Sequence, residues 1–598
     1  MTLLVPFVLA ALALWASEVV ADEQQSARIS VTGPLTGIDR QTGAAPARMN
    51  INDMWARGGP SWDLYVLALA ELQAVDESDE LSYFQIMGIH GLPFRGWSDV
   101  GQVAGGSNMA GFCPHSQLLF GLWHRPFISL YEASRAQTLV THAIQIAQQY
   151  ASDKAPTYRD AAEKLRVAYW DWAADPSLPE VITLENIGVN GPNGPVTIRN
   201  PLHSYYFQNY PFTLQYMNGG PLSKQNHSTR CPTKDLVDDV AKVNAGLASS
   251  GFKGQVYNTF TTVTSFQNME TDRYTSASFE SPHNNVHNTV GCSNGSMYDL
   301  NWSAFDPAFM LHHANVDRLI ALWQAIYPNA SIFNVVDWAG ALYGTPAGYV
   351  SADTPLKPFH DDGGGYDGFH TSRSVRDISV LGYTYPELQV QSGSGSGGGN
   401  SSNSSQSLSP DELADHVRFM VNALYSNLPP QGNDTAPHLR SLAGRLRGMD
   451  RVPTRRPHAT RKTWSVAISV DRADVPLPAT IGCFLGEGNQ VGRMSLLAIP
   501  AEGVTHSTIP LDTALGAVGG LDLADAEEVA GYLNQTLRFE VVMGDGTPID
   551  NIESIPSLQF VVQDRDYTPR ENDMEFPTYG PASTRKWGRR HGRWAMSD

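Results

Sequence analysis

Residues 305–318 read FDPAFMLHHANVDR, a hydrophobic helix start that carries two adjacent histidines, His312 and His313. A lone histidine is usually a surface or hydrogen-bonded residue. In an apolar helix, however, an imidazole without a partner costs roughly 2 kcal/mol or more. The stretch therefore predicts a helical core in which something other than water satisfies buried histidines.

Other histidines lie in comparable settings. His283 and His287 are four residues apart, so both imidazoles lie on one helix face, a spacing that suits chelation of a single ion. Upstream, His90, His115 and His124 fall within a short stretch, and His124 has aromatic and apolar neighbours. Two metal ions would satisfy two sets of three histidines.

The type of metal follows from the donor set. No carboxylate ligand is evident beside these histidines, which favours copper over iron or manganese, while zinc remains chemically possible. The sequence has no HExxH motif, and no glutamate stands at that offset in the helix of His283 and His287. A zinc protease is therefore disfavoured.

The 598-residue length favours two packed domains with a leader and linkers. Helical spacing in 61–75 and 115–150 predicts a mainly α domain, a helical bundle that holds the histidines. Short β-branched runs after a capped helix start at Ser409 predict a C-terminal β-sandwich. The expected division is a signal peptide 1–21, a helical domain 22–391, a Gly/Ser/Asn-rich linker 392–409, a β-rich domain 410–570 and a basic tail 571–598.

Composition limits the partners. The net charge of -19 disfavours nucleic acid and anionic membranes, so we expect neither as a partner of the mature protein. The apolar run in 1–21 predicts a signal peptide and secretion, and Asn-x-Ser/Thr sequons permit glycosylation. Four cysteines are too few for a disulfide scaffold, so stability should come from burial and bound metal.

The order and wording of these motifs resemble the tyrosinase, catechol oxidase and hemocyanin superfamily, most closely the secreted long fungal tyrosinases. The resemblance covers roughly residues 48–385 and includes Pro46-x-Arg48, the YWDW of 169–172 and the YTY of 383–385. It implies a type-3 centre of two copper ions with O2 as co-substrate. The implied ligands are His90, His115 and His124 for one copper, and His283, His287 and His313 for the other. His313 is preferred because it stands four residues before Asp317, and His312 is then a packing residue or orients a ligand.

The same resemblance implies two further features. Cys113, two residues before His115, stands where fungal members carry a thioether to the imidazole; a small buried hydrophobe or a disulfide partner is the alternative. Arg48 is expected to stack against Tyr383 or Tyr385 and to tie the two ends of the domain together.

The implied activity is hydroxylation of monophenols and oxidation of o-diphenols to o-quinones, with melanin formation as one outcome. Phenol has a pKa near 10, so a nearby base helps it to bind as phenolate. Glu280 and Asn284 resemble the pair that holds a deprotonating water in tyrosinases, although a solvated glutamate and a backbone-bonding asparagine are the plain alternatives.

Two other functions remain open. One is an oxidase restricted to o-diphenols or o-aminophenols, which needs no strong base. The other is a hemocyanin-like O2 carrier. The tether and the β-rich domain also predict a latent zymogen, activated by a protease that removes the cover, with Phe484 as a candidate blocking residue.

Overall fold

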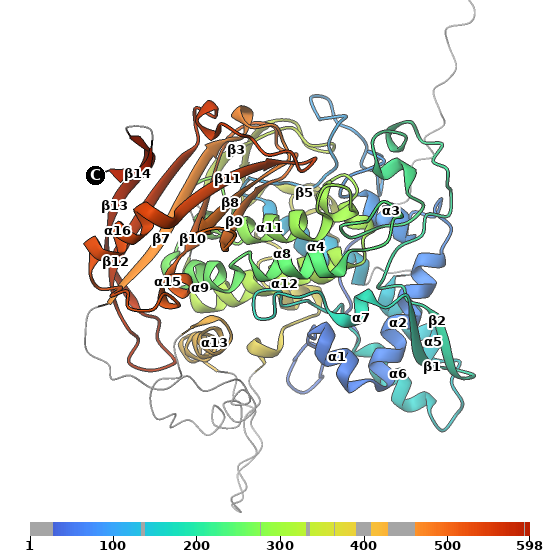
Figure 1. Ribbon diagram of the computed structural model, residues 1–598. Coiled ribbons are helices and arrows are strands. Elements are labelled where there is room, and N and C mark those ends of the chain that lie inside the picture. Colours follow the sequence, from blue (N-terminus) through green and yellow to red (C-terminus); the bar gives the residue numbers. More distant parts are fainter. Residues whose placement is uncertain are drawn as a thin grey trace, which may run out of the picture.

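The computed structural model describes residues 28–132, 138–275, 277–330, 335–363, 365–389, 408–427, 461–590 and 593–597 (Figure 1). The expected signal peptide and nearly all of the expected linker lie outside these residues. Two bodies of structure follow one another along the chain, a helical one up to residue 389 and a β-rich one from residue 461.

The helical domain is built around three helices that lie almost wholly in the interior, α4, α11 and α12 (Figure 1). A helix that is buried on all sides belongs to a core, and α12 meets this description because nearly all of its residues are buried, the polar ones included. The helices are α1 (Ile51–Arg57), α2 (Gly59–Ala74), α3 (Tyr83–Gly88), α4 (Phe120–Glu132), α5 (Leu139–Ala147), α6 (Ala155–Glu163), α7 (Glu180–Thr183), α8 (Val240–Ala248), α9 (Phe252–Thr262), α10 (Phe266–Glu270), α11 (Glu280–Gly291) and α12 (Ala308–Ile326).

This domain also contains three two-stranded antiparallel sheets. They pair β1 (Asn186–Gly191) with β2 (Gly194–Arg199), β3 (Val336–Ala339) with β4 (Gly348–Ser351), and β5 (Pro355–His360) with β6 (Phe369–Thr371). None of the helices in the described ranges is both long and apolar enough to cross a membrane.

The C-terminal body consists of two antiparallel sheets that enclose their own apolar core. One sheet has the order β10-β7-β12-β13-β14 and the other β11-β8-β9. The elements are β7 (Arg461–Asp471), β8 (Ala479–Leu485), β9 (Gln490–Leu496), β10 (Val504–Pro510), α15 (Asp512–Gly516), α16 (Ala526–Thr536), β11 (Leu537–Met543), β12 (Gln559–Thr568), β13 (Thr578–Arg590) and β14 (Arg593–Ser597). The predicted fold class, a helical domain followed by a β-sandwich, is confirmed.

Two segments differ from the expected division. Residues 571–598 were set apart as a basic tail, but β13 and β14 fall within them, and β13 pairs with β12 along most of its length. The strands satisfy their backbone groups in the sheet, which a solvated tail would leave to water. The β-rich domain therefore continues past residue 570.

The second segment is helix α13 (Pro410–Tyr425), which begins at the predicted Ser409–Glu412 capping box. The expected division places it in the β-rich domain, yet Val417 and Tyr425 are buried in the helical domain's core. The Tyr425 hydroxyl donates to Asp171 at 2.8 Å and accepts from Arg318 at 2.9 Å. By its packing, α13 is part of the helical domain.

A buried ion network ties the two ends of the helical domain together. Arg48 forms ion pairs with Glu132 at 2.9 Å and with Asp317 at 3.1 Å. Its guanidinium carbon lies 3.4 Å from the centre of the Tyr383 ring, and the hydroxyl of Tyr385 lies within hydrogen-bonding distance of Arg48 Nη1. Arg48 thus lies in the position that the predicted stacking against Tyr383 or Tyr385 requires.

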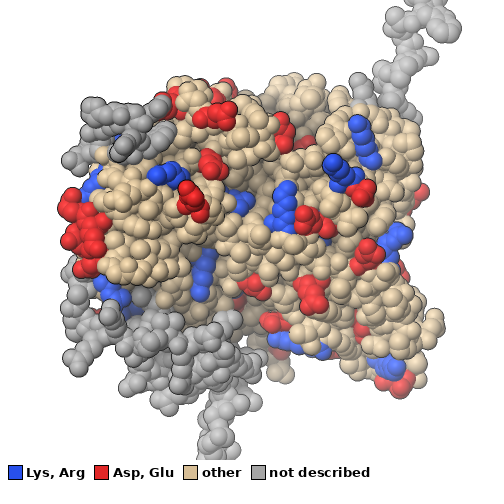
Figure 2. Space-filling view, in the orientation of Figure 1, with Lys and Arg blue, Asp and Glu red and all other residues tan. Residues whose placement is uncertain are grey.

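Both basic and acidic side chains are scattered over the face shown in Figure 2, and one denser group of acidic side chains lies at its left edge. Inside the molecule, Cys231 and Cys292 form a disulfide, a pairing that the sequence did not reveal. It fastens the C-terminal end of α11 to the loop that precedes α8.

Candidate metal centre

The core of the helical domain brings two buried groups of potential metal ligands together. In each group the ligand atoms lie within 4.8 Å of one another. The first group comes from the end of α3, the loop before α4 and α4 itself, and comprises His90, Cys113, His115 and His124. The second comes from α11 and α12 and comprises His283, His287, His312 and His313.

Hydrogen bonds fix the orientation of several rings. Three Nδ1 atoms lie within hydrogen-bonding distance of backbone carbonyls. They belong to His90 (3.0 Å from Leu300 O), His124 (2.7 Å from Phe120 O) and His287 (2.9 Å from Met297 O). Because a carbonyl only accepts, each Nδ1 carries the proton and each Nε2 keeps its lone pair. These rings therefore present Nε2 as the metal-binding atom.

The imidazoles are also held in their neutral form. Burial lowers the pKa of His124 to about 3 and that of His287 to about 4. Burial and neighbouring histidines likewise lower the pKa of His90, His283 and His313. A metal binds the neutral imidazole, so no proton has to be displaced from these rings near pH 7.

The unpaired atoms of the cluster test whether metal ions fit. His90 Nε2 is buried and has no hydrogen-bond partner among the described atoms. Such an atom costs free energy unless a ligand satisfies it. Six imidazoles without a carboxylate form a donor set suited to copper, and the residues therefore fit a pair of copper ions.

The two groups adjoin each other. The rings of His124 and His313 lie 4.1 Å apart between centroids, and those of His115 and His283 lie 5.9 Å apart. Ions held by the two groups would therefore be neighbours.

The geometry distinguishes His313 from His312. His313 Nε2 lies 3.3 Å from His283 Nε2 and 3.4 Å from His287 Nε2, so three Nε2 atoms converge on one point. The His312 ring instead stacks on His283, with 4.9 Å between the ring centroids. This convergence supports His313 as the ligand.

Cys113 lies against the ring of His115. Its Sγ is 3.5 Å from Nδ1 and 3.7 Å from Nε2 of that ring, and it is 3.2 Å from Nε2 of His124. Burial raises the pKa of this thiol, which keeps it protonated.

Glu280 and Asn284 lie beside the histidines on α11, and both are buried. The Glu280 carboxylate accepts from the backbone N–H of Ser116 at 2.6 Å and of Asp272 at 3.2 Å. Asn284 contacts the ring of His283 and the carboxylate of Asp272. Burial and the neighbouring Asp272 raise the pKa of Glu280.

Asp272 and Arg472 are two residues of this region that the sequence analysis missed. Arg472, in the loop after β7, is almost fully buried. The pKa of His115 is lowered mainly by burial, then by the neighbouring histidines, and to a smaller extent by the charge of Arg472. Its guanidinium donates to the carbonyls of Leu497 and Pro500. Phe484, the residue suggested as the block, lies in β8 beside Gly482. No local sequence pattern marks either residue. Asp272 meets Glu280 and Asn284, 8 and 12 residues ahead, only through the turn between α10 and α11, and the carbonyls that Arg472 contacts lie 25 and 28 residues ahead of it.

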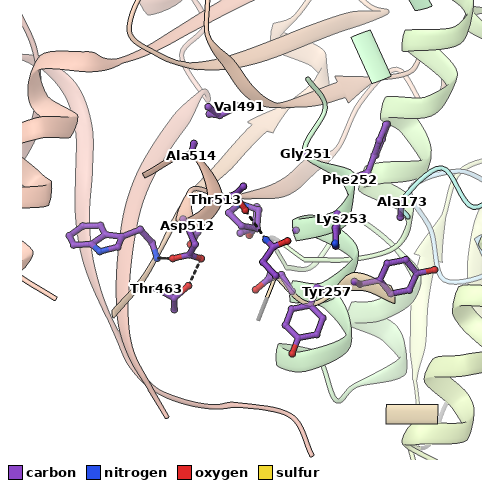
Figure 3. A pocket seen from close by; sticks show the side chains of 18 of the residues that line it. Ala173, Gly251, Phe252, Lys253, Tyr257, Thr463, Val491, Asp512, Thr513 and Ala514 are labelled. Carbon is purple, nitrogen blue, oxygen red and sulfur yellow. Dashed lines mark hydrogen bonds between the residues drawn. The ribbon is translucent and has the colours of Figure 1, made fainter. Parts of the chain in front are cut away.

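A cavity of about 540 Å³ opens between the two domains (Figure 3). It lies between α9 and the β-rich domain, and Asp512 in its wall accepts from Thr463 at 2.6 Å and from the Trp464 backbone N–H at 2.9 Å. None of the histidines of the two groups lines it. The cavity is therefore separate from the metal centre.

Comparison with known proteins gives two matching family models. Residues 80–326 match the common central domain of tyrosinase, and residues 463–562 match the tyrosinase C-terminal domain. All eight residues of the two ligand groups lie in the first match, and they fit the two copper sites of that family.

Curated relatives include polyphenol oxidase 2 of Agaricus bisporus, 32% identical over 58% of this chain and 62% of the relative. Another is the tyrosinase of Neurospora crassa, 32% identical over 60% of this chain and 55% of the relative. The chain thus spans somewhat over half the length of these relatives.

Among solved structures, that of latent and active mushroom tyrosinase covers 93% of this chain and 98% of its own, with a TM-score of 0.75 and 25% identity. A pro-tyrosinase of Aspergillus oryzae covers 94% and 98%, with a TM-score of 0.67 and 20% identity, and shows the fold alone.

Proposed function

Because the chain belongs to the tyrosinase family, we propose that it is a phenol oxidase that uses O2 to hydroxylate monophenols and to oxidise o-diphenols to o-quinones. The observation that carries the proposal is the convergence of two buried groups of neutral imidazoles in one core. The ligands would be His90, His115 and His124 for one copper, and His283, His287 and His313 for the other.

Bound copper would supply O2 binding and electron transfer, so no nucleophilic side chain is required. The chain's own residues hold the imidazoles neutral, fix their Nε2 atoms toward the metal and exclude bulk water. Glu280 takes the phenolic proton, and its buried carboxylate has a raised pKa that suits a base for a weak acid.

Copper content and O2 uptake test the proposal. The copper-loaded protein should hold two coppers per chain and consume O2 with both a tyrosine-like phenol and catechol. A chain that binds two coppers and O2 but oxidises neither substrate, before and after proteolysis, would be a carrier. Absence of bound copper after loading would overturn the proposal.

The choice of His313 has a matched control in its neighbour. His313→Phe should lose one of the two coppers, because it removes one of three converging Nε2 atoms. His312→Phe should retain both, because its ring only stacks on His283. The opposite pattern would exchange their roles.

A specific observation favours a second candidate, an oxidase restricted to o-diphenols. Both oxygens of Glu280 already accept from backbone amides, and these bonds stabilise the charged carboxylate, oppose the rise in its pKa that burial causes and so weaken it as a base. Glu280→Gln separates the two functions: it should lower monophenol turnover far more than catechol turnover. Equal losses would favour the restricted oxidase.

We further propose a thioether between Cys113 and His115, because the thiol lies within 3.7 Å of both nitrogens of that ring. The C–S bond would replace the S–H bond and one ring C–H bond, and O2 with bound copper would be the two-electron oxidant that takes up the two hydrogens. The bond would fix one ligand ring and limit its exchange. Intact mass of the protein, compared with that of Cys113→Ala, should show the loss of two hydrogens only in the wild type.

The signal peptide, the sequons and the covering domain together support a secreted, glycosylated zymogen that a protease activates, with melanin as one product class. The β-rich domain bonds to the helix that carries His283 and His287, for example through Asn285 Oδ1, which accepts from the Ser495 backbone N–H at 2.8 Å. Limited proteolysis should raise phenol oxidation. Release of the domain without a gain in activity would refute the latency.

A further inference from the structure

Asp272 lies in the segment between α10 and α11 and touches both residues to which we assign the phenol chemistry. Its backbone N–H donates to Glu280 Oε2 at 3.2 Å. Its side-chain Oδ2 accepts from Asn284 Nδ2 at 3.1 Å. The residue is only 2% exposed, so these contacts do not compete with bulk water.

The donors and acceptors of this chain of contacts have only one consistent assignment. The carboxylate of Asp272 can only accept, so Asn284 must turn its NH2 group toward it. The amide oxygen of Asn284 then faces His283 Nδ1 at 2.9 Å and can only accept from it. His283 Nδ1 must therefore carry the proton, and its Nε2 is left as the lone pair that meets His313.

We infer that Asp272 is a positioning residue of the copper centre, which acts through Asn284 to fix the ring of His283 and to hold the amide in place for monophenol deprotonation. The inference rests on the proposed function. Three other ligands obtain the same protonation state from backbone carbonyls, which cannot turn. His283 alone among these four relies on a side-chain amide, and an amide can flip unless a second contact holds it.

A competing role for Asp272 is attachment of the covering domain. Its backbone carbonyl accepts from the His506 N–H at 2.8 Å, and the Arg472 guanidinium opposes the effect of burial, which raises the pKa of the Asp272 carboxyl. The backbone bond to His506 survives a side-chain substitution, whereas the attraction between the carboxylate and Arg472 does not. A role confined to the cover would change latency and leave copper binding and substrate preference as they are.

The test uses the full-length copper-loaded protein before and after limited proteolysis. Asp272→Ala removes the acceptor and should weaken copper binding about tenfold in chelator competition, the size typical for residues that orient ligands. It should also lower the monophenol kcat/KM about tenfold more than the catechol kcat/KM. Asp272→Asn keeps one acceptor oxygen and should fall between wild type and Asp272→Ala.

Asp63 provides the matched control. It is buried to the same degree and accepts from Asn190 Nδ2 at 3.3 Å, but it lies on α2, bonds to β1 and belongs to neither histidine group. Asp63→Ala should lower stability without changing copper affinity or the ratio of monophenol to catechol turnover. If Asp63→Ala and Asp272→Ala behave alike, the effect is structural and the inference is wrong.

A double-mutant cycle tests the route of action. If Asp272 acts through Asn284, the variant Asp272→Ala/Asn284→Ala should be no worse than Asn284→Ala alone. Multiplied effects would overturn the inference. If the wild type oxidises both catechol and phenol, and Asp272→Ala has the same copper affinity and the same ratio of monophenol to catechol turnover, only this inference is refuted. If the wild type oxidises no phenol, the proposed function is refuted.

Discussion

Removal of the Cys231–Cys292 disulfide should destabilise the helical domain through the helix that carries two of the proposed ligands. The bridge joins residues 61 positions apart, and the closed loop contains α8, α9, α10 and α11. His283 and His287 lie on α11, whose C-terminal end is Cys292. The perturbation is the double substitution Cys231→Ser/Cys292→Ser.

The size of the effect follows from the length of the loop. Closing a loop of 61 residues removes conformational entropy from the unfolded chain worth about 4 kcal/mol at 25 °C. Both cysteines also have left-handed backbone, with φ of 46° and 53°, which disfavours any side chain. Serine inherits that cost, whereas Cys231→Gly/Cys292→Gly relieves it and should therefore lose less stability.

Denaturant unfolding with and without a thiol reductant measures the loss. Reduction should shift the wild-type transition of the helical domain to that of the serine variant, which should itself be insensitive to reductant. Cys483→Ala, which removes a buried thiol outside the bridge, serves as the control and should keep the response to reductant. If the serine variant unfolds at the wild-type midpoint, the bridge does not constrain the unfolded chain and the reasoning fails.

Three shorter predictions concern other buried groups. Burial raises the pKa of Glu270 to about 8, above its unfolded value, so stability falls as pH rises from about 4.5 to 8, by about 5 kcal/mol at most. Glu270→Gln should flatten the dependence of Tm on pH over that range. Tyr425→Phe removes a buried hydroxyl from Arg318 and should cost the helical domain about 2 kcal/mol in denaturant unfolding. Arg472→Gln removes the positive charge that faces the carboxylates of Asp272 and Glu280. In O2 uptake the uncleaved variant should be about fivefold more active than uncleaved wild type, and the two should be equal after cleavage.

The metal centre was predictable because its signal is local in sequence. The i,i+4 pair of His283 and His287 and the apolar surroundings of His313 can be read without knowing the fold. The cap at Ser409 likewise fixed the start of α13 correctly. In each case the residues that decide the structure lie within a few positions of one another.

What the sequence could not predict depends on long-range packing. The face of α13 that carries Val417 and Tyr425 is apolar, but nothing local states which domain it packs against. The pairing of Cys231 with Cys292 and the contact of Asp272 with Asn284 require the fold itself. Residues 571–598 were predicted to be a solvated tail because they are basic. In a strand, however, alternate side chains can face solvent while the backbone pairs with a neighbouring strand, as β13 does with β12.

Helix α11 explains how one element can serve both the metal centre and the cover. Its His283 and His287 side chains face the other ligands. Other side chains of the same helix bond to the β-rich domain: Ser281 to Ser507 at 2.7 Å, and Asn285 to β9.

These contacts to the β-rich domain are hydrogen bonds between polar groups, which water could replace if proteolysis released that domain, as the proposed latency requires. An apolar face on α11 would have been left exposed by removal of the cover, at a cost proportional to its area. The polar outer face of α11 therefore allows the β-rich domain to pack closely against it. The same face could become exposed to water while the inner face of α11 keeps its histidines in place.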